Sequence, residues 1–294
     1  MSAGGEIVGF IGLGTMGAPM ATNIAAVGYD MRVYDADPEA ATAVADRIGA
    51  TAVADVAGLA ECTIVVLMLP TSAIVRSVLL TPEGGSRIPF ESGAVVVDMS
   101  SSDPTETVET GRALAAAGVA MVDAPVSGAR ERAVAGTLAI MLGTDDVAAA
   151  ERAVPVIEAM SRAIYRTGKL GTGHAMKALN NFVAGAAFVA TSEALVAGQR
   201  FGLDPQLMVD VFNDSTGQSF STTHVFGPHV VDRRFASGFA LPLITKDVRI
   251  AHELQRAVGH DAPVCAAVTA SLEDALEALG PVDHTAAYTH WESR

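Results

Sequence analysis

The first half of the sequence alternates short runs of β-branched and apolar residues with longer stretches that have a helical pattern. Buried strands are expected at residues 7–11, 31–34, 63–69, 94–99, 120–123 and 138–142. Helices are expected between them, among others at residues 16–27, 38–48 and 105–117. Unbroken apolar runs are typical of strands covered on both faces, and their alternation with helices is typical of a parallel sheet. The first half therefore predicts an α/β domain.

The pattern changes after about residue 168. Residues 168–173 form a glycine-rich link, and residues 174–200 form one long helical pattern without proline. The remainder is helical, with breaks expected at Pro205, at 216–217, between 227 and 242, and at 280–281. We expect a Rossmann-like, mostly parallel α/β domain at residues 1–168. A long helix then joins it to an all-helical domain at residues 169–294.

The charge and the cysteine content exclude several classes of protein. The 294 residues carry a net charge of −14, which argues against a nucleic-acid or anionic-membrane partner because both require a cationic face. Cys62 and Cys265 lie far apart and lack metal-ligand spacing, so neither a disulfide framework nor a zinc site is expected. The N-terminus lacks a signal-peptide pattern, and the apolar stretch 182–190 is too short to span a bilayer. We expect a soluble, cytoplasmic protein.

A glycine motif follows the first expected strand and opens the first expected helix. It reads Gly12-Leu13-Gly14-Thr15-Met16-Gly17, the G-x-G-x-x-G pattern of dinucleotide-binding turns. Glycines allow a tight turn and a close approach of backbone N–H groups to a pyrophosphate at the positive end of a helix. An ordinary strand-to-helix turn is the alternative. A protein-kinase loop is excluded because no kinase catalytic motif follows.

Asp35 ends the second expected strand, 18 residues after Gly17. A carboxylate at this place accepts hydrogen bonds from the adenosine ribose hydroxyls of NAD and repels the 2′-phosphate of NADP. Ala36 and Asp37 follow it, so no arginine is present to hold such a phosphate. NAD is therefore preferred as the cofactor, with NADP second. The alternative for Asp35 is a helix cap ahead of Pro38.

Further motifs follow in a fixed order along nearly the whole chain. They are residues 10–23 around the glycine motif, Met68-Leu69-Pro70, Asp98-Met99-Ser100-Ser101, Asp123-Ala124-Pro125-Val126-Ser127-Gly128, Gly136-Thr137-Leu138, Gly171-Thr172-Gly173 with Lys177 and Asn180-Asn181, and Lys246-Asp247. Together they resemble the β-hydroxyacid dehydrogenase family, which includes 3-hydroxyisobutyrate dehydrogenase and tartronate semialdehyde reductase. The resemblance implies a hydride transfer between NAD and a small β-hydroxy acid or its semialdehyde.

The resemblance also implies roles for single residues. The cofactor is contacted by Leu69, Pro70, Ser102 and Lys246 in addition to the glycine motif and Asp35. The substrate carboxylate is bound by Ser127, Gly128 and Ala129, with Asn180 nearby, and the catalytic pair is Lys177 and Asn181. The chain departs from many family members in having Ala129 where a second glycine follows the serine, and then Arg130-Glu131-Arg132. These arginines either pair at the surface or clamp a second acidic group of the substrate.

The spacing of Lys177 and Asn181 places both on one helix face, because residues four apart are neighbours on a helix. As an ammonium, Lys177 would protonate the nascent alkoxide during reduction, and as a neutral amine it would accept the hydroxyl proton during oxidation. Both roles require a pKa below that of free lysine. A solvated helical lysine is the alternative, but the neighbouring Ala178, Leu179 and Phe182 make this turn apolar.

The predicted enzyme is thus an NAD-dependent dehydrogenase with its active site in the cleft between the domains. The first alternative is a reductase of the same family that acts on glyoxylate, succinic semialdehyde or tartronate semialdehyde. The others are an imine reductase, a phosphogluconate-type dehydrogenase and a non-catalytic dinucleotide-binding scaffold. The resemblance implies a homodimer or homotetramer. Small residues at 184–187 in the long helical pattern are the sequence feature that suggests such an assembly, and we expect the long helix of the helical domain to pack at the subunit interface.

Overall fold

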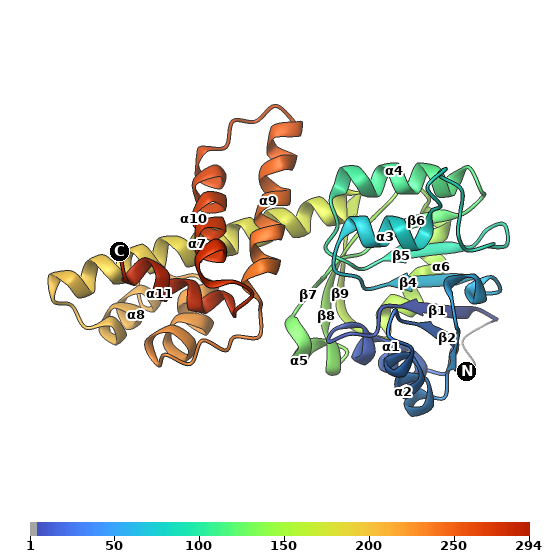
Figure 1. Cartoon of the computed structure of the whole chain (residues 1–294), viewed down its shortest axis with the longest axis horizontal. Coiled ribbons are helices and arrows are strands. Elements are labelled where there is room, and N and C mark those ends of the chain that lie inside the picture. Colours follow the sequence, from blue (N-terminus) through green and yellow to red (C-terminus); the bar gives the residue numbers. More distant parts are fainter. Residues whose placement is uncertain (1–4) are drawn as a thin grey trace. The chain divides into compact units, whose positions relative to one another are not determined.

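The computed structural model describes residues 5–294 and divides the chain into two compact units that meet in sequence between Lys177 and Ala178 (Figure 1). The first unit contains one nine-stranded sheet, whose main path runs in the order β3-β2-β1-β4-β5-β6-β8-β7, with β9 paired to β8. The strands are β1 Ile7–Ile11, β2 Asp30–Tyr34, β3 Thr51–Ala52, β4 Ile64–Leu67, β5 Val95–Asp98, β6 Ala120–Asp123, β7 Val126–Ser127, β8 Leu138–Thr144 and β9 Ser161–Gly168.

The pairing of the strands is mostly parallel. Strands β1 to β6 pair in parallel, with Val8 of β1 opposite Met31 of β2 on one side and Ile64 of β4 on the other. Strand β8 runs antiparallel to β6 and β7, and β9 runs parallel to β8. The order 3-2-1-4-5-6 is that of the Rossmann fold, so the predicted fold class is confirmed.

Helices cover both faces of this sheet. The first face is covered by α1 Gly17–Ala26, α2 Pro38–Ile48, α5 Ala129–Val134 and α6 Val147–Glu158, and the second by η1 Val56–Leu59, α3 Ser72–Leu79 and α4 Pro104–Ala115. Successive residues of a strand point to opposite faces. In β4, Ile64 and Val66 accordingly enter the core beneath the first group of helices, whereas Val65 and Leu67 enter the core beneath the second. Burial on both sides explains why the strands read as unbroken apolar runs.

The six predicted strands and three predicted helices are all present, with ends that differ by a few residues. Strands β3, β7 and β9, and helices η1, α3 and α6, were not predicted. Strand β9 is eight residues long but only half-buried, and it contains serine, arginine, tyrosine and threonine. An apolar run is the sequence signal of a strand covered on both faces, and this edge strand lacks such a run.

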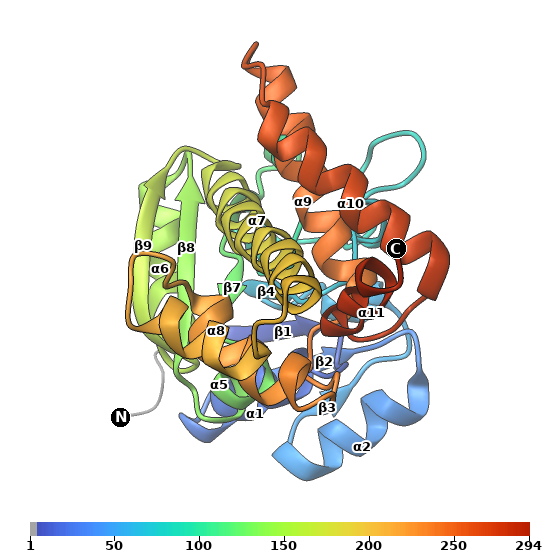
Figure 2. The ribbon, with the colours of Figure 1, turned by 90° about the vertical axis from the view of Figure 1, so that its left-hand side faces the viewer.

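The second unit is helical and contains most of α7 Thr172–Phe201 (Figure 2). The other elements are α8 Pro205–Asn213, the π-helix η2 Thr222–Val231, α9 Leu241–Ala257, α10 Pro263–Leu279, η3 His284–Ala286 and α11 Ala287–Glu292. Phe188 and Phe226 stack at the centre of its core, with ring centroids 5.2 Å apart. The break expected between residues 227 and 242 is confirmed, because η2 ends at Val231 and α9 begins at Leu241.

The small residues in the middle of α7 serve packing within the chain. A Cβ atom added at Gly185 would lie 3.1 Å from Val248 on α9 and 3.7 Å from Leu272 on α10. The predicted close approach of another helix therefore occurs to α9 and α10 of the same chain. These two helices lie side by side in both views (Figures 1 and 2).

Helix α7 is the one described helix long and apolar enough to cross a membrane by length and composition. Core helices of soluble proteins pass the same test, and Phe188 and Leu195 of α7 are buried in the helical core. Both cysteines, Cys62 and Cys265, are free and buried. Burial raises the pKa of the Cys62 thiol to about 12, so this side chain is a poor nucleophile.

Candidate active site

The glycine motif forms the connection between β1 and α1. Gly12 has a φ of +93°, and a Cβ atom there would lie 2.4 Å from the carbonyl oxygen of Met68. A Cβ atom at Gly17 would lie 1.8 Å from the carbonyl oxygen of Gly12. The first and third glycines are therefore required by the tight turn and by the packing of α1 on the strands.

Gly14 differs from these two because no described protein atom lies within 4 Å of the position of its Cβ. Gly14 and Thr15 are exposed, and α1 lacks a side-chain cap at its N-terminus. Open space above a glycine and uncapped N–H groups at a helix N-terminus fit a bound pyrophosphate, because its oxygens accept from such groups. The residues present therefore fit a dinucleotide.

Asp35 lies beside this loop at the end of β2. Its carboxylate accepts hydrogen bonds from the backbone N–H of Leu13 at 2.6 Å and of Asp37 at 2.9 Å. The cap of α2 is instead Asp37, which accepts from the N–H groups of Glu39 and Ala40. Asp35 thus holds the glycine loop and is not a helix cap.

Two neighbouring loops at the carboxyl ends of β4 and β5 are tied together by hydrogen bonds. The backbone N–H of Leu69 donates to Ser100 Oγ at 2.9 Å, and the Ser102 hydroxyl donates to Asp98 Oδ2 at 2.9 Å. Ser102 is buried, whereas Pro70 is exposed just after β4. The hydroxyl of Ser102, one of the predicted cofactor residues, therefore orders the loop after β5.

A buried polar cluster that was not predicted surrounds the start of α7. Asp98 and Asp123, at the ends of β5 and β6, and His174 are almost fully buried. Asp123 accepts from the backbone N–H groups of Gly171 and His174, each at 2.8 Å, and so caps α7. His174 Nδ1 lies 2.8 Å from the Thr107 hydroxyl, and His174 Nε2 lies 3.8 Å from Asp98 Oδ2.

This cluster fixes the first turns of α7, which include the half-buried Lys177 three residues after His174. Burial raises the pKa of the Asp123 carboxyl, while the facing His174 and the two backbone N–H donors oppose that rise. His174 is not among the site residues expected from the sequence. The sequence signal that could have predicted this cluster is an aspartate at the end of each of two apolar strands. A buried carboxylate requires hydrogen-bonding or charged partners nearby.

The predicted carboxylate-binding residues form a strained turn at the junction of β7 and α5. Ser127 is half-buried, Gly128 has a φ of +144°, and Ala129 has a φ of +55°. A left-handed backbone is costly for alanine and free of strain for glycine. This explains why a second glycine suits this position, as the resemblance implied.

We therefore expect Ala129→Gly to raise the free energy of unfolding by about 0.5–1 kcal/mol, because relief of left-handed strain exceeds the added freedom of the unfolded chain. Urea denaturation measures the change. Ala135→Gly is the matched control, since Ala135 has a φ of −77° and gains nothing. Equal or lower stability of the Ala129 variant would contradict the strain.

The second group of predicted residues lies on α7 and α9 in the helical unit. Asn181 is buried; its Oδ1 accepts from Asn180, and its Nδ2 donates to Asp247 Oδ2 at 2.6 Å. Lys246 Nζ lies 3.1 Å from Asp247 Oδ1. The buried Asp247 thus joins Asn181 of α7 to Lys246 of α9, a link that the sequence did not predict.

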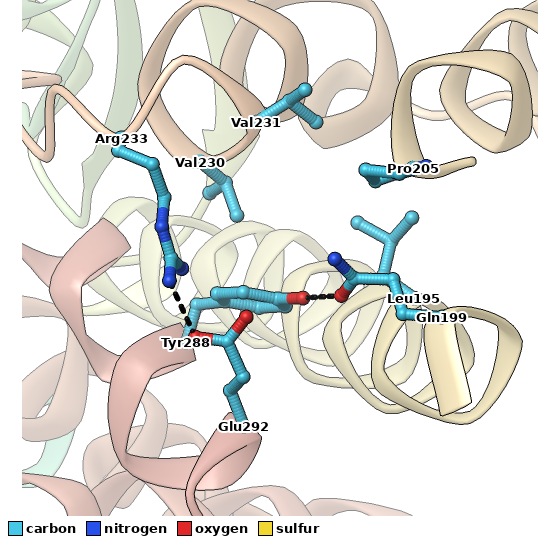
Figure 3. A pocket seen from close by; sticks show the side chains of 8 residues that line it. All are labelled: Leu195, Gln199, Pro205, Val230, Val231, Arg233, Tyr288 and Glu292. Atoms are coloured by element: carbon cyan, nitrogen blue, oxygen red, sulfur yellow. Dashed lines mark hydrogen bonds and ion pairs between the residues drawn. The ribbon is translucent and has the colours of Figure 1, made fainter. Parts of the chain in front are cut away.

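Each unit also contains a pocket. That of the first unit is lined by Gly14, Thr15, Ala18, Pro19, Thr22, Asn23, Arg47, Arg130 and Val134. That of the helical unit contains none of the predicted site residues (Figure 3). There Arg233 forms an ion pair with Glu292, and the Tyr288 hydroxyl donates to Gln199. Among the described residues, no group of histidine, cysteine, aspartate or glutamate could hold a metal ion.

Comparison with known proteins identifies the family. A family model described as the NAD binding domain of 6-phosphogluconate dehydrogenase matches residues 7–168. A second, described as NAD-binding of NADP-dependent 3-hydroxyisobutyrate dehydrogenase, matches residues 171–291. The chain belongs to the β-hydroxyacid dehydrogenase family. The resemblance inferred from the motifs is thereby confirmed, and the protein is an NAD-dependent dehydrogenase acting on hydroxyl groups of small acids.

Relatives of this dehydrogenase share most of its length. The 2-(hydroxymethyl)glutarate dehydrogenase of Eubacterium barkeri is 36% identical over 97% of this chain and 94% of its own. The NAD-dependent L-serine dehydrogenase of Pseudomonas aeruginosa is 33% identical over 87% and 88%. A solved structure of Mycobacterium tuberculosis 3-hydroxyisobutyrate dehydrogenase with L-serine has a TM-score of 0.88 and 29% identity, and covers 99% of both chains.

Proposed function

We propose that the dehydrogenase interconverts a small β-hydroxy acid and its semialdehyde, with Lys177 as the general acid and base. The observation that carries this assignment is the anchoring of α7 by Asp123, which fixes the turn before Lys177 through two buried hydrogen bonds. Preorganised groups catalyse better than mobile ones, because their orientation is set before reaction. When bound, the nicotinamide supplies the hydride chemistry.

In oxidation, the neutral amine of Lys177 accepts the proton of the substrate hydroxyl. In reduction, its ammonium polarises the carbonyl and returns the proton to the nascent alkoxide. Asn181 is held by Asp247 through its Nδ2, and we propose that it orients the catalytic face of α7. Because Asn181 is uncharged, it does not form an ion pair with the Lys177 amine, which can therefore gain and lose a proton during the reaction.

The substrate carboxylate is proposed to bind at Ser127, Gly128 and Ala129, with Asn180 as a further contact. Successive backbone N–H groups of a turn can form an anion-binding concavity, and Gly128 and Ala129, both with positive φ, make such a turn here. Candidate substrates follow the names of the relatives: 3-hydroxyisobutyrate, L-serine and 2-(hydroxymethyl)glutarate each carry a carboxylate and a nearby hydroxyl.

A panel of these acids, assayed with NAD and NADP in both directions, tests the proposal. We expect turnover with one or more of the acids, with a requirement for both the carboxylate and the β-hydroxyl. Substrates lacking the carboxylate are the control and should react with a much lower kcat/KM. Absence of turnover with every acid, despite binding of NADH, would contradict the proposed substrate class.

NAD is proposed as the preferred dinucleotide because of Asp35. We expect Asp35→Asn to raise the ratio of kcat/KM for NADP to that for NAD about tenfold, since it removes the charge that repels a 2′-phosphate. The matched control is Asp37→Asn, which changes the neighbouring carboxylate that caps α2. An unchanged ratio in the Asp35 variant would remove this residue from cofactor selection.

We further propose a homodimer or homotetramer of a soluble, cytoplasmic enzyme, with the subunit interface on the helical unit. Large apolar side chains are exposed near the end of α7 and on the elements after it, including Phe201 at 89% and Phe220 at 68%. We propose that these side chains contribute to one contiguous apolar surface, because such patches mark interaction sites. Sedimentation of the protein with Phe201→Ser or Phe220→Ser tests this assignment.

A further inference from the structure

Two arginines line the pocket that contains the glycine loop. Arg130 comes from α5 and Arg47 from the last turn of α2, the two helices that pack beside α1 (Figure 1), and both line the pocket that contains Gly14 and Thr15. Among the described residues, neither guanidinium has a hydrogen bond or ion pair. Two unpaired cations beside a phosphate-binding loop contrast with the net charge of −14.

The position of Arg130 is set by the backbone on both sides of it. The left-handed Gly128 and Ala129 redirect the chain after β7, so that α5 begins beside α1. Asn23 of α1 then donates from Nδ2 to the carbonyl oxygen of Ala133 at 2.7 Å, which ties α5 to α1. Arg130 is therefore presented from a fixed helix toward the pocket of the glycine loop.

We propose that Arg130, assisted by Arg47, binds the pyrophosphate oxygens of the dinucleotide. An unpaired guanidinium offers a planar set of N–H donors, which matches phosphate oxygens in a bidentate manner. The role differs from a clamp on a second acidic group of the substrate, because the pocket around Arg130 contains Gly14 and Thr15 of the cofactor loop and lacks Ser127. The proposal rests on binding of the dinucleotide at the glycine motif.

Calorimetric titration with NADH, ADP-ribose and adenosine tests the proposal. We expect Arg130→Ala to weaken NADH and ADP-ribose about tenfold, or about 1.4 kcal/mol, and to leave adenosine unchanged, because only the first two contain the pyrophosphate. Arg47→Ala should also weaken the binding of NADH and ADP-ribose. Added salt should weaken NADH binding more in the wild type than in Arg130→Ala, since salt screens an exposed cation.

Arg132→Ala is the matched control for cofactor affinity, because Arg132 lies on the same helix outside the pocket lining. Arg130→Lys retains the charge and should recover part of the affinity, and thermal unfolding verifies that each variant is folded. NADH affinity of folded Arg130→Ala within twofold of the wild type would overturn the proposal. So would a loss confined to the KM of the acid substrate. Failure of the wild type to bind NADH would instead overturn the proposed function.

Discussion

Lys177→Ala is expected to lower kcat by 10²- to 10⁴-fold while the dissociation constant for NADH stays within about threefold. The reason is that the variant keeps the glycine loop and loses the group that moves the substrate proton. In the wild type, the oxidation rate should rise with pH, because the neutral amine is the base. The variant should lose this rise. Steady-state kinetics across pH and NADH titration measure the two effects.

Lys169→Ala is the matched control, because Lys169 is exposed on the link before α7 and has no proposed role. Its rates should equal those of the wild type. A near-normal kcat in folded Lys177→Ala would remove Lys177 from the mechanism. A large loss of NADH affinity would instead indicate that this lysine binds the cofactor.

Gly17→Ala is expected to lower the free energy of unfolding by about 3 kcal/mol and to abolish NADH binding. The added methyl group would lie 1.8 Å from the carbonyl oxygen of Gly12, a backbone atom that cannot move without opening the turn. Urea denaturation and NADH titration measure both losses.

Gly14→Ala separates binding from folding, since open space surrounds its Cβ position. We expect a melting temperature close to that of the wild type and NADH affinity at least tenfold lower, because the methyl group would occupy the space through which the backbone approaches the pyrophosphate. Wild-type affinity in Gly14→Ala would show that the dinucleotide does not lie over this glycine. Wild-type stability in Gly17→Ala would contradict the tight packing of the turn.

Local signals in the sequence predicted the elements that carry the site. The run from Ile7 to Ile11 followed by three glycines predicted both the strand and the loop, because the apolar pattern and the turn chemistry act over a few residues. The half-exposed β9 escaped prediction because its side chains lack that pattern. The helical break expected between residues 227 and 242 is present between η2 and α9, where glycine and proline gave a local signal.

The sequence suggested the members of the candidate site one by one, but not the contacts between them. Asp35 is predicted to contact the cofactor, and in the structure its carboxylate accepts a hydrogen bond from the backbone N–H of Leu13 in the glycine loop. Asn181 was expected beside Lys177, and its amide is bound to Asp247, 66 positions later in the chain. The hydrophobic periodicity of the sequence does not reveal such pairs, because two partners far apart in the chain produce no local pattern.

The sequence by itself determined the α/β unit, the helical region, the dinucleotide turn and the family, because each depends on short motifs or on their order. Only the tertiary structure decided which polar groups come together: Asp98 and Asp123 around His174, Asp247 between Asn181 and Lys246, and Arg130 in the pocket that Gly14 also lines. The physical reason is that a buried or partly enclosed charge is stabilised by whatever the fold brings within a few ångströms. Those neighbours come from strands and helices far apart in the chain.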